Sequence, residues 1–378
     1  MQSNRLTTSL MAALLAVVVA PVTAQPTATA TPPLTSEMMP LVTSRSLILD
    51  MTEASARAVA VGERGEILIS ESRTEWRQVA DVPTRSTLTA VSAVGNDVWA
   101  VGHDGTILVS HDSGLTWSQQ RRDVLDTSPD AVFDPRQGVP LLDVLMLDAK
   151  HGFACGAYSQ LLRTDDGGAN WHFVSTKAGD VDVDADDDDL DTYEDDDTAG
   201  IGDEDSWTFS DDDLAMDDIA EPHFNAIART GSGALIIAGE RGTVFRSRDN
   251  GASWERLQLP YGGSMFGAIG YEGDHVLVFG MRGNAYESHD LGETWEQVDT
   301  NTDLSLMGGA GFGNGGFALV GANGIVLTRT DSRSAPKLGI HTNAAHETPV
   351  LAGVLVRPNR SLVVAGEKGV DTFTPNSK

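Results

Sequence analysis

Several features that would indicate an enzyme, a disulfide scaffold or a membrane span are missing from this sequence. Its 378 residues include one cysteine, so no internal disulfide can form. Beyond the N-terminal region no run of about eighteen consecutive apolar residues occurs. His-Glu-x-x-His, Gly-x-Ser-x-Gly and Walker phosphate-loop motifs are also missing. The sequence therefore contains none of these catalytic motifs, and its most informative feature is a repeated pattern.

Helical periodicity is nearly absent, and a short apolar run that ends in glycine recurs instead. The closing glycines are Gly62, Gly102, Gly156, Gly239, Gly280, Gly321 and Gly366. Their basic period of about 40 residues, with two insertions, is typical of propeller blades. In the second unit the pattern predicts strands at 88–94, 98–102, 106–110 and 117–120. We therefore predict an all-β, seven-bladed β-propeller of four-stranded antiparallel blades, over residues 38–374.

The two ends of the predicted ring suggest how it closes. The seventh unit supplies three strands and stops before a fourth. The segment Met38–Thr43, which precedes the first blade, is available to fill that place. Pairing the first and last segments would remove an open sheet edge. We expect this N-terminal strand to complete the last blade.

The N-terminus has the composition of an export signal. Asn4-Arg5, the apolar stretch Leu10–Ala20 and the small residues Val22-Thr-Ala24 predict a signal peptide over residues 1–24. Residues 25–37, rich in Pro, Thr and Ala, are expected to be a flexible leader. We expect a periplasmic or extracellular protein, without a transmembrane segment in the mature chain. The lone Cys155 lies at an apolar strand position of the repeat and is expected to be buried and unreactive.

Positive charge is scarce, but the imbalance is concentrated in one segment. Asp180–Glu221 holds 21 of the 55 acidic residues and no Lys or Arg, so the rest of the chain carries a formal charge of −8 instead of −29. Its composition predicts a disordered acidic insertion, residues 178–221, between blades three and four. Two further interpretations stay open. Asp180, Asp182 and Asp184 have the spacing of a weak calcium loop, although Ala185 replaces the turn glycine. Trp207, Phe209 and Tyr193 could anchor an acidic docking loop.

A second repeated element ends in tryptophan. Four segments match S/T-x-D-x-G-x-x-W, the Asp box: Ser110–Trp117, Thr164–Trp171, Ser247–Trp254 and Ser288–Trp295. The motif residues are Asp112, Gly114, Trp117, Asp166, Gly168, Trp171, Asp249, Gly251, Trp254, Asp290, Gly292 and Trp295. Ser, Thr and Asp side chains bind turn amides, and Gly allows positive φ. We assign these residues a structural role in the turn between the third and fourth strands.

Together, the apolar run, glycine, two-residue turn, third strand and Asp box, after a signal peptide, resemble the photosystem II stability/assembly factor-like family. This family is a branch of the seven-bladed Asp-box, or BNR-repeat, propellers. The resemblance covers roughly Ser46–Thr374, with the acidic insertion foreign to it. It implies a protein-binding scaffold: members in phototrophs resemble lumenal chaperones of a reaction-centre subunit, and bacterial relatives are secreted proteins. Nothing in this sequence establishes a link to photosynthesis, and we expect a non-photosynthetic bacterial member.

An enzyme of the sialidase type is the main alternative, because sialidases also contain Asp boxes. Such a glycoside hydrolase needs three arginines around a carboxylate, a Tyr nucleophile with an acidic partner, and an Asp acid/base. The chain has five tyrosines and no Arg-Ile-Pro segment of the kind that often opens sialidase domains. No catalytic residues, cofactor or defined metal site are therefore predicted, and the nine histidines show no close metal-ligand pair in sequence. A structural or calcium-responsive surface protein is the second alternative.

The turns between second and third strands carry the most specific functional hint. The second residue of each turn is Arg64, Asp104, Tyr158, Arg241, Arg282, Asn323 and Lys368 in successive blades. Equivalent positions share one face of a propeller, so Arg64, Arg241, Arg282, Lys368 and Tyr158 form the predicted partner-binding face. The alternative is that these cations only keep exposed turns soluble.

The acidic insertion joins a fourth strand to the next blade, and such connections emerge on the same face as these turns. We therefore hypothesise that this face binds an anionic or extended protein segment, and that the insertion can cover it. The expected function is a monomeric, secreted assembly or accessory factor for a membrane or envelope protein complex. Nucleic acid is a poor candidate partner for a secreted chain of this charge.

Overall fold

The structure is a computed structural model that describes residues 34–40, 42–123, 136–176 and 221–375. The predicted signal peptide, most of the leader, and the acidic insertion with Asp180, Asp182, Asp184, Tyr193, Trp207 and Phe209 lie outside these residues. The described part from Leu34 onward is one compact unit. Among its residues, no helix is long and apolar enough to cross a membrane.

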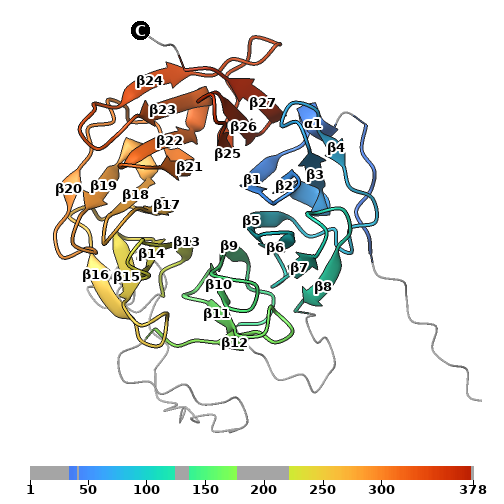
Figure 1. The fold of residues 1–378 in the computed structure, drawn as a ribbon, viewed down its shortest axis with the longest axis horizontal. Coiled ribbons are helices and arrows are strands. Elements are labelled where there is room, and N and C mark those ends of the chain that lie inside the picture. The colour runs from blue at the N-terminus through green and yellow to red at the C-terminus, as the bar shows by residue number, and fades with distance from the viewer. Residues whose placement is uncertain (1–33, 41, 124–135, 177–220, 376–378) are drawn as a thin grey trace, which may run out of the picture. The chain divides into compact units, whose positions relative to one another are not determined.

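Seven antiparallel sheets are arranged around a central axis, so the predicted seven-bladed β-propeller is confirmed (Figure 1). Six described sheets have four strands and the seventh has three. Blade one comprises β1 (Ile48–Glu53), β2 (Ala58–Gly62), β3 (Ile67–Ser70) and β4 (Arg77–Gln78), and blade two comprises β5 (Leu88–Val94), β6 (Asp97–Gly102), β7 (Ile107–Ser110) and β8 (Ser118–Arg121). Blade three comprises β9 (Leu141–Met146), β10 (Gly152–Gly156), β11 (Leu161–Thr164) and β12 (His172–Phe173), and blade four comprises β13 (Phe224–Arg229), β14 (Leu235–Gly239), β15 (Thr243–Ser247) and β16 (Glu255–Gln258).

The last three blades complete the ring. They comprise β17 (Met265–Gly270), β18 (Val276–Gly280), β19 (Ala285–Ser288) and β20 (Glu296–Gln297); β21 (Leu306–Phe312), β22 (Gly316–Gly321), β23 (Ile325–Arg329) and β24 (Lys337–Ile340); and β25 (Leu351–Val356), β26 (Leu362–Gly366) and β27 (Gly369–Phe373). The first strand of each blade lies at the centre (Figure 1). The second strands are buried along their whole length except at Asp97, the first residue of β6, because each lies between neighbouring strands and neighbouring blades.

The expected N-terminal closing strand is wrong. The described residues 38–40, 42 and 43 contain no strand, and Val42–Arg45 form a single helical turn, α1. The preceding residues are held on the first blade: Met39 N donates to Gln78 Oε1 (2.8 Å), and Ser36 N donates to the Val82 carbonyl (2.9 Å). The chain reaches the seventh blade at α1, which lies against β27 as a helical turn: a Cβ at Gly369 would lie 2.2 Å from the Thr43 carbonyl oxygen.

The ring closes through side-chain packing instead of a shared sheet. Ile48 and Met51 of β1 share a buried cluster with Leu355 of β25 and Val363 of β26. Partly buried Met39 packs against the same cluster. Closure thus rests on apolar contact between the first and last blades, with the N-terminal segment covering the junction.

The glycine that ends each second strand is required by a close backbone approach. A Cβ at Gly102 would lie 2.0 Å from the Thr87 carbonyl oxygen, and the equivalent distance at Gly62, to the Leu47 oxygen, is 2.1 Å. The φ angle of Gly62 is −167°, which any residue adopts, so lack of space and not backbone strain selects glycine here. The opposing first strand has a β-bulge at this level in all seven blades, which explains the tight approach.

Candidate functional site

Two faces of the propeller can be distinguished by their hydrogen bonds. On one face, the turn between second and third strands bonds to the connection that enters the same blade, as in His103 N to the Thr87 carbonyl (2.9 Å). We call this the turn face. On the other, the turn between third and fourth strands bonds to the turn between first and second strands, as in Ser113 N to the Asn96 carbonyl (2.9 Å). We call this the Asp-box face.

The predicted partner-binding residues all lie on the turn face with exposed side chains. Arg64, Tyr158, Arg241 and Arg282 have φ between 53° and 56°, and the equivalent Asp104 (58°) and Asn323 (54°) have similar values. Positive φ at this position, followed by glycine in most blades, is the geometry of a tight hairpin turn. Lys368 differs, because it is not among the residues with positive φ and only the glycine after it, Gly369 (φ 79°), is left-handed in the last blade.

The charge of this ring is smaller than the four cations suggest. Glu63, Glu240 and Glu367 immediately precede Arg64, Arg241 and Lys368 in the turns, and Asp104 occupies the second blade. The formal charges of the seven two-residue turns therefore cancel. Arg282 follows Met281 and has no acidic neighbour within its turn. Positive potential is consequently concentrated near blade five instead of being spread around the ring.

A chain of contacts connects turn-face residues across blades three to five. The ring of Tyr158, which is 64% exposed, lies edge-on to the ring of His223 at 5.0 Å. His223 N donates to Glu240 Oε2 (3.2 Å), next to Arg241. Farther along, Tyr261 Oη donates to the Met281 carbonyl (3.4 Å), next to Arg282. We name Tyr158, His223, Arg241, Tyr261 and Arg282 the aromatic–basic strip.

The acidic insertion rejoins the described chain beside this strip. Ser159, adjacent to Tyr158, donates from its backbone nitrogen (2.9 Å) and its hydroxyl (3.1 Å) to the Pro222 carbonyl. Pro222 follows the last residue of the insertion, Glu221. The described end of this segment, Glu221-Pro222, therefore lies on the turn face next to Tyr158 and Ser159.

Five of the seven residues in the bulges of the central strands, inward of the turns, are apolar. The bulge residues are Leu49, Thr89, Leu142, Asn225, Phe266, Met307 and Ala352. Each is only partly buried, and Met307 is 39% exposed. The turn face thus combines a mostly apolar inner rim with polar and aromatic turn residues.

The Asp-box residues bind their own turns. In the second blade Ser110 Oγ accepts from Gly114 N (2.9 Å), and Asp112 Oδ1 accepts from Thr116 N (2.9 Å). The same bonds recur in blades three, four and five. These bonds lower the pKa of Asp166 and Asp290 to about 2. The carboxylates are therefore used within the turns.

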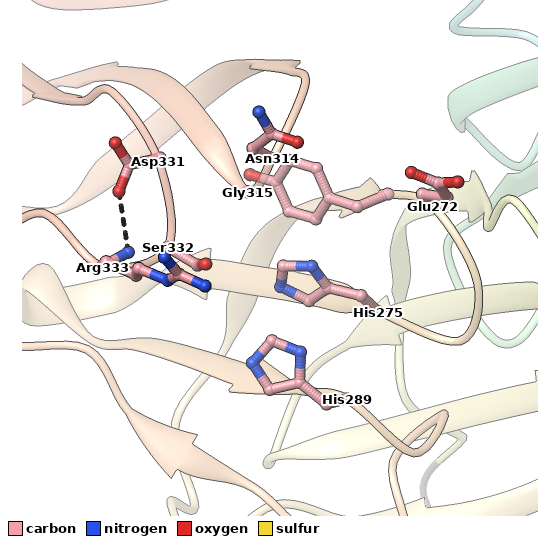
Figure 2. A pocket seen from close by; sticks show the side chains of 9 residues that line it. Glu272, His275, His289, Asn314, Gly315, Asp331, Ser332 and Arg333 are labelled. Atoms are coloured by element: carbon pink, nitrogen blue, oxygen red, sulfur yellow. Dashed lines mark hydrogen bonds between the residues drawn. The ribbon is translucent and has the colours of Figure 1, made fainter.

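A pocket of about 610 Å³ lies between blades five and six on the Asp-box face. Its lining includes Tyr271, His275 and His289 of blade five and Arg333 of blade six. The Tyr271 and His275 rings stack at 4.4 Å, and the His275 and His289 rings lie 4.1 Å apart (Figure 2). Burial raises the pKa of Tyr271, which is the opposite of what an activated tyrosine nucleophile requires.

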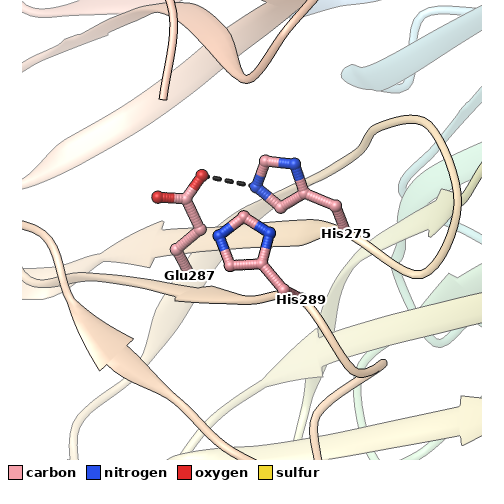
Figure 3. A group of neighbouring side chains, drawn as sticks. All are labelled: His275, Glu287 and His289. Atoms are coloured by element: carbon pink, nitrogen blue, oxygen red, sulfur yellow. Dashed lines mark hydrogen bonds and ion pairs between the residues drawn. The ribbon is translucent and has the colours of Figure 1, made fainter. Parts of the chain in front are cut away.

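A buried ion pair supports this pocket. Glu287 accepts from Arg329 Nη1 (2.8 Å) and Nη2 (2.6 Å), and it also bonds to His275 (Figure 3). Burial acts to raise the Glu287 pKa, but the bonds and charges of His275 and Arg329 outweigh it and bring the pKa down to about 2. Glu287 is therefore an anion at any physiological pH.

Sequence reasoning missed the His275–Glu287–His289 group because twelve and fourteen residues separate Glu287 and His289 from His275. The β18–β19 register pairs Val276 with Ser288, so His275 and His289 flank one cross-strand pair. Alignment of the repeats by their closing glycines would have indicated this proximity.

Two further acidic residues, both partly buried, lie between the central strands. Asp50 Oδ2 accepts from Val91 N of blade two, and Asp143 Oδ2 accepts from Ile227 N of blade four, both at 2.8 Å. Burial raises the pKa of each to about 7, and the charge of Asp50 contributes to the shift at Asp143. Cys155, paired with Asp143 across the strands, is fully buried as predicted, and burial raises its thiol pKa well above the usual value.

The fold defines the chain as a seven-bladed β-propeller. Its structure is similar to YCF48 bound to a D1 peptide, with 16% identity, a TM-score of 0.58, and coverage of 94% of this chain and 99% of that one. It is also similar to YCF48 from Cyanidioschyzon merolae, with 14% identity, a TM-score of 0.57, and coverage of 86% and 94%.

An enzyme occurs among the similar structures too. Streptogramin B lyase has 11% identity and a TM-score of 0.61, with coverage of 87% of this chain and 93% of that one. No family model matches the sequence, and no curated protein matches it. At these identities the similarities establish the propeller fold, and the function has to be argued from the surface.

Proposed function

We propose that this chain is a secreted or periplasmic protein-binding propeller that holds an extended, acidic segment of a partner protein on its turn face. The partner belongs to a membrane or envelope complex, and the chain acts as its assembly or accessory factor. The observation that carries the proposal is the aromatic–basic strip, because it places the exposed side chains of Tyr158, Arg241 and Arg282 on one face, beside a mostly apolar rim. The similarity to a propeller bound to a D1 peptide supports a peptide ligand.

The strip favours a peptide over a small substrate. Its members are spread over three blades. The exposed side chains of Tyr158 and Arg282 do not converge on one enclosed cavity. Aromatic rings provide contact area at little conformational cost, while Arg241 and Arg282 supply charge for carboxylates. The insertion, which rejoins the chain at Pro222, is acidic and therefore competes with an acidic partner for the same side chains.

Affinity capture from native envelope extract tests the proposal. The wild-type chain is compared with an Arg64/Arg241/Arg282/Lys368 quadruple alanine variant and with Arg248→Ala on the Asp-box face as the matched control. Arg248 is also exposed and ion-paired (3.1 Å to Glu293), so it controls for loss of surface charge. We expect the quadruple variant to lose a partner that the control retains. Identical partner lists for all three proteins would contradict a role for the turn face.

Deletion of residues 180–221 tests the competing insertion. Binding of a synthetic acidic peptide, followed by fluorescence anisotropy, should strengthen in the deletion variant at low salt and converge with wild type at high salt. Equal affinities at low salt would contradict competition by the insertion.

A further inference from the structure

The His275–Glu287–His289 group on the Asp-box face brings together three side chains with metal-ligating atoms. Each residue offers one ligand atom, and these atoms all lie within 4.8 Å of one another. His275 immediately precedes β18, Glu287 lies on β19, and His289 follows β19 in the Asp-box turn. Figure 3 shows the three side chains gathered together, with the Glu287 carboxylate bonded to His275 and the His289 ring beside the His275 ring. We propose that His275, Glu287 and His289 form a binding site for a divalent transition metal of the Zn²⁺ class.

The donor set matches this class of metal. Two imidazole nitrogens and one carboxylate oxygen are ligands that Zn²⁺ prefers, and they leave a fourth position open. The hydrogen bond between His275 and Glu287 already places one nitrogen and one oxygen side by side, so a metal replaces the proton that they share. The fourth position opens toward the pocket between blades five and six.

His289 completes the site by a side-chain movement. Its ring is tilted 31° from that of His275, at a centroid distance of 4.1 Å, so the two nitrogen lone pairs are not yet directed at one point. The His289 side chain is exposed, and its rotation moves no buried group. The backbone of this turn is meanwhile held by the Ser288 and Asp290 bonds.

Arg329 determines which metals the site selects. Its guanidinium, 4% exposed, neutralises part of the Glu287 charge and holds the carboxylate orientation, as outer partners of metal ligands do. A carboxylate compensated in this way is a weak ligand for Ca²⁺ or Mg²⁺, which depend on oxygen donors and charge. The two imidazoles therefore supply most of the affinity, which favours Zn²⁺ over both.

Blade two provides a matched control. Its Ser110-His111-Asp112 turn repeats Ser288-His289-Asp290, and the register pairs Val98 with Ser110 as it pairs Val276 with Ser288. Asp97 accordingly takes the place of His275, and Val109 takes the place of Glu287. His111 Nδ1 lies 2.7 Å from Asp97 Oδ1. Blade two therefore has an equivalent exposed histidine but lacks the second imidazole and the buried carboxylate.

Isothermal titration of the untagged protein with ZnCl₂ tests the proposal, with CaCl₂ and MgCl₂ titrated in parallel. All variants retain the acidic insertion, so cation binding by the insertion contributes equally to every titration. We expect one Zn²⁺ site that His289→Ala weakens by at least about tenfold and that His111→Ala leaves unchanged. His289→Asn serves as a second variant with the same expected loss.

A spectroscopic measurement completes the test. Co²⁺ substituted at the site should give visible absorption bands that depend on His275 and His289 and are unaffected by His111→Ala. Equal Zn²⁺ affinity in wild type and both His289 variants would overturn the proposal. An equal loss in His289→Ala and His111→Ala would also overturn it, because it would indicate nonspecific binding to surface histidines.

Discussion

Arg329 on the third strand of blade six binds Glu287 on the third strand of blade five through two parallel hydrogen bonds of 2.8 and 2.6 Å. Arg329 occupies the position that Ser or Thr takes in the Asp boxes of the other blades, since it pairs with Phe317 as Ser288 pairs with Val276. Its guanidinium also donates to the Gly315 carbonyl (2.9 Å from Nε) and lies 4.6 Å from the centre of the Phe317 ring. Blades five and six are thus joined by an interaction that departs from the repeat.

Arg329→Met should destabilise the protein strongly. The substitution leaves Glu287 charged and buried with one partner, and removal of one member of a buried pair typically costs about 3–5 kcal/mol. Chemical denaturation measures the free energy of unfolding, with the exposed pair member Arg248→Ala as a control expected to cost less than about 1 kcal/mol. A loss for Arg329→Met no larger than for Arg248→Ala would contradict the assigned importance of the pair.

The same pair should contribute to acid unfolding. The Glu287 pKa is lowered from 4.5 to about 2 in the folded protein, so its stabilisation is present above pH 4.5 and is lost as the pH falls toward 2. In Glu287→Gln the free energy of unfolding should depend less steeply on pH within this window. Denaturation curves at a series of pH values measure how the free energy of unfolding changes with pH. The same pH dependence in Glu287→Gln and wild type would show that folding does not lower the Glu287 pKa.

Asp50 and Asp143 should act in the opposite direction and at higher pH. Their pKa values are raised from 3.8 to about 7, so stability is fully present below pH 3.8 and is lost as the pH rises through this range toward 7. Asn cannot ionise, so the double variant Asp50→Asn/Asp143→Asn should lose less stability than wild type between pH 5 and pH 8. Parallel pH dependence of both proteins over this interval would contradict the raised values.

Gly102→Ala should destabilise the second blade by about 1–3 kcal/mol, because the new Cβ would lie 2.0 Å from the Thr87 carbonyl oxygen and the bulge would have to shift. Gly262→Ala is the control, since a Cβ there meets nothing within 4 Å. The control should be neutral or slightly stabilising through a less flexible unfolded chain. Thermal unfolding of both variants measures the difference, and equal Tm values would show that the close approach is unimportant.

Removal of the N-terminal segment should lower stability even though it forms no strand. A chain that begins at Arg45 loses the Met39–Gln78 and Ser36–Val82 hydrogen bonds and the apolar cover of the blade one and blade seven junction. We expect Tm to fall by about 5 °C or more relative to a chain that begins at Leu34. Equal Tm values would show that packing between blades is sufficient for closure.

Local sequence patterns were enough to predict most of the fold, but they predicted little of the candidate functional site. The closing glycines gave the blade number because each must avoid a carbonyl oxygen one strand away, a constraint that repeats with every blade. They also placed Arg64, Tyr158, Arg241 and Arg282 in exposed turns on one face. The closing strand was mispredicted because hydrogen bonds to Gln78, far away in sequence, hold the segment on blade one.

By itself the sequence determined the number of blades, the strand order within them, and the turn that each motif occupies, because these depend on contacts between neighbouring strands. Tertiary structure alone decided which side chains from different blades meet: Arg329 with Glu287, Asp50 with Val91, and Tyr158 with His223. Contacts between blades depend on how the sheets stack, and stacking brings together positions that no local pattern relates. The regular scaffold can therefore be predicted from the repeat. The pocket of blade five forms where Glu287 and Arg329 depart from the repeat.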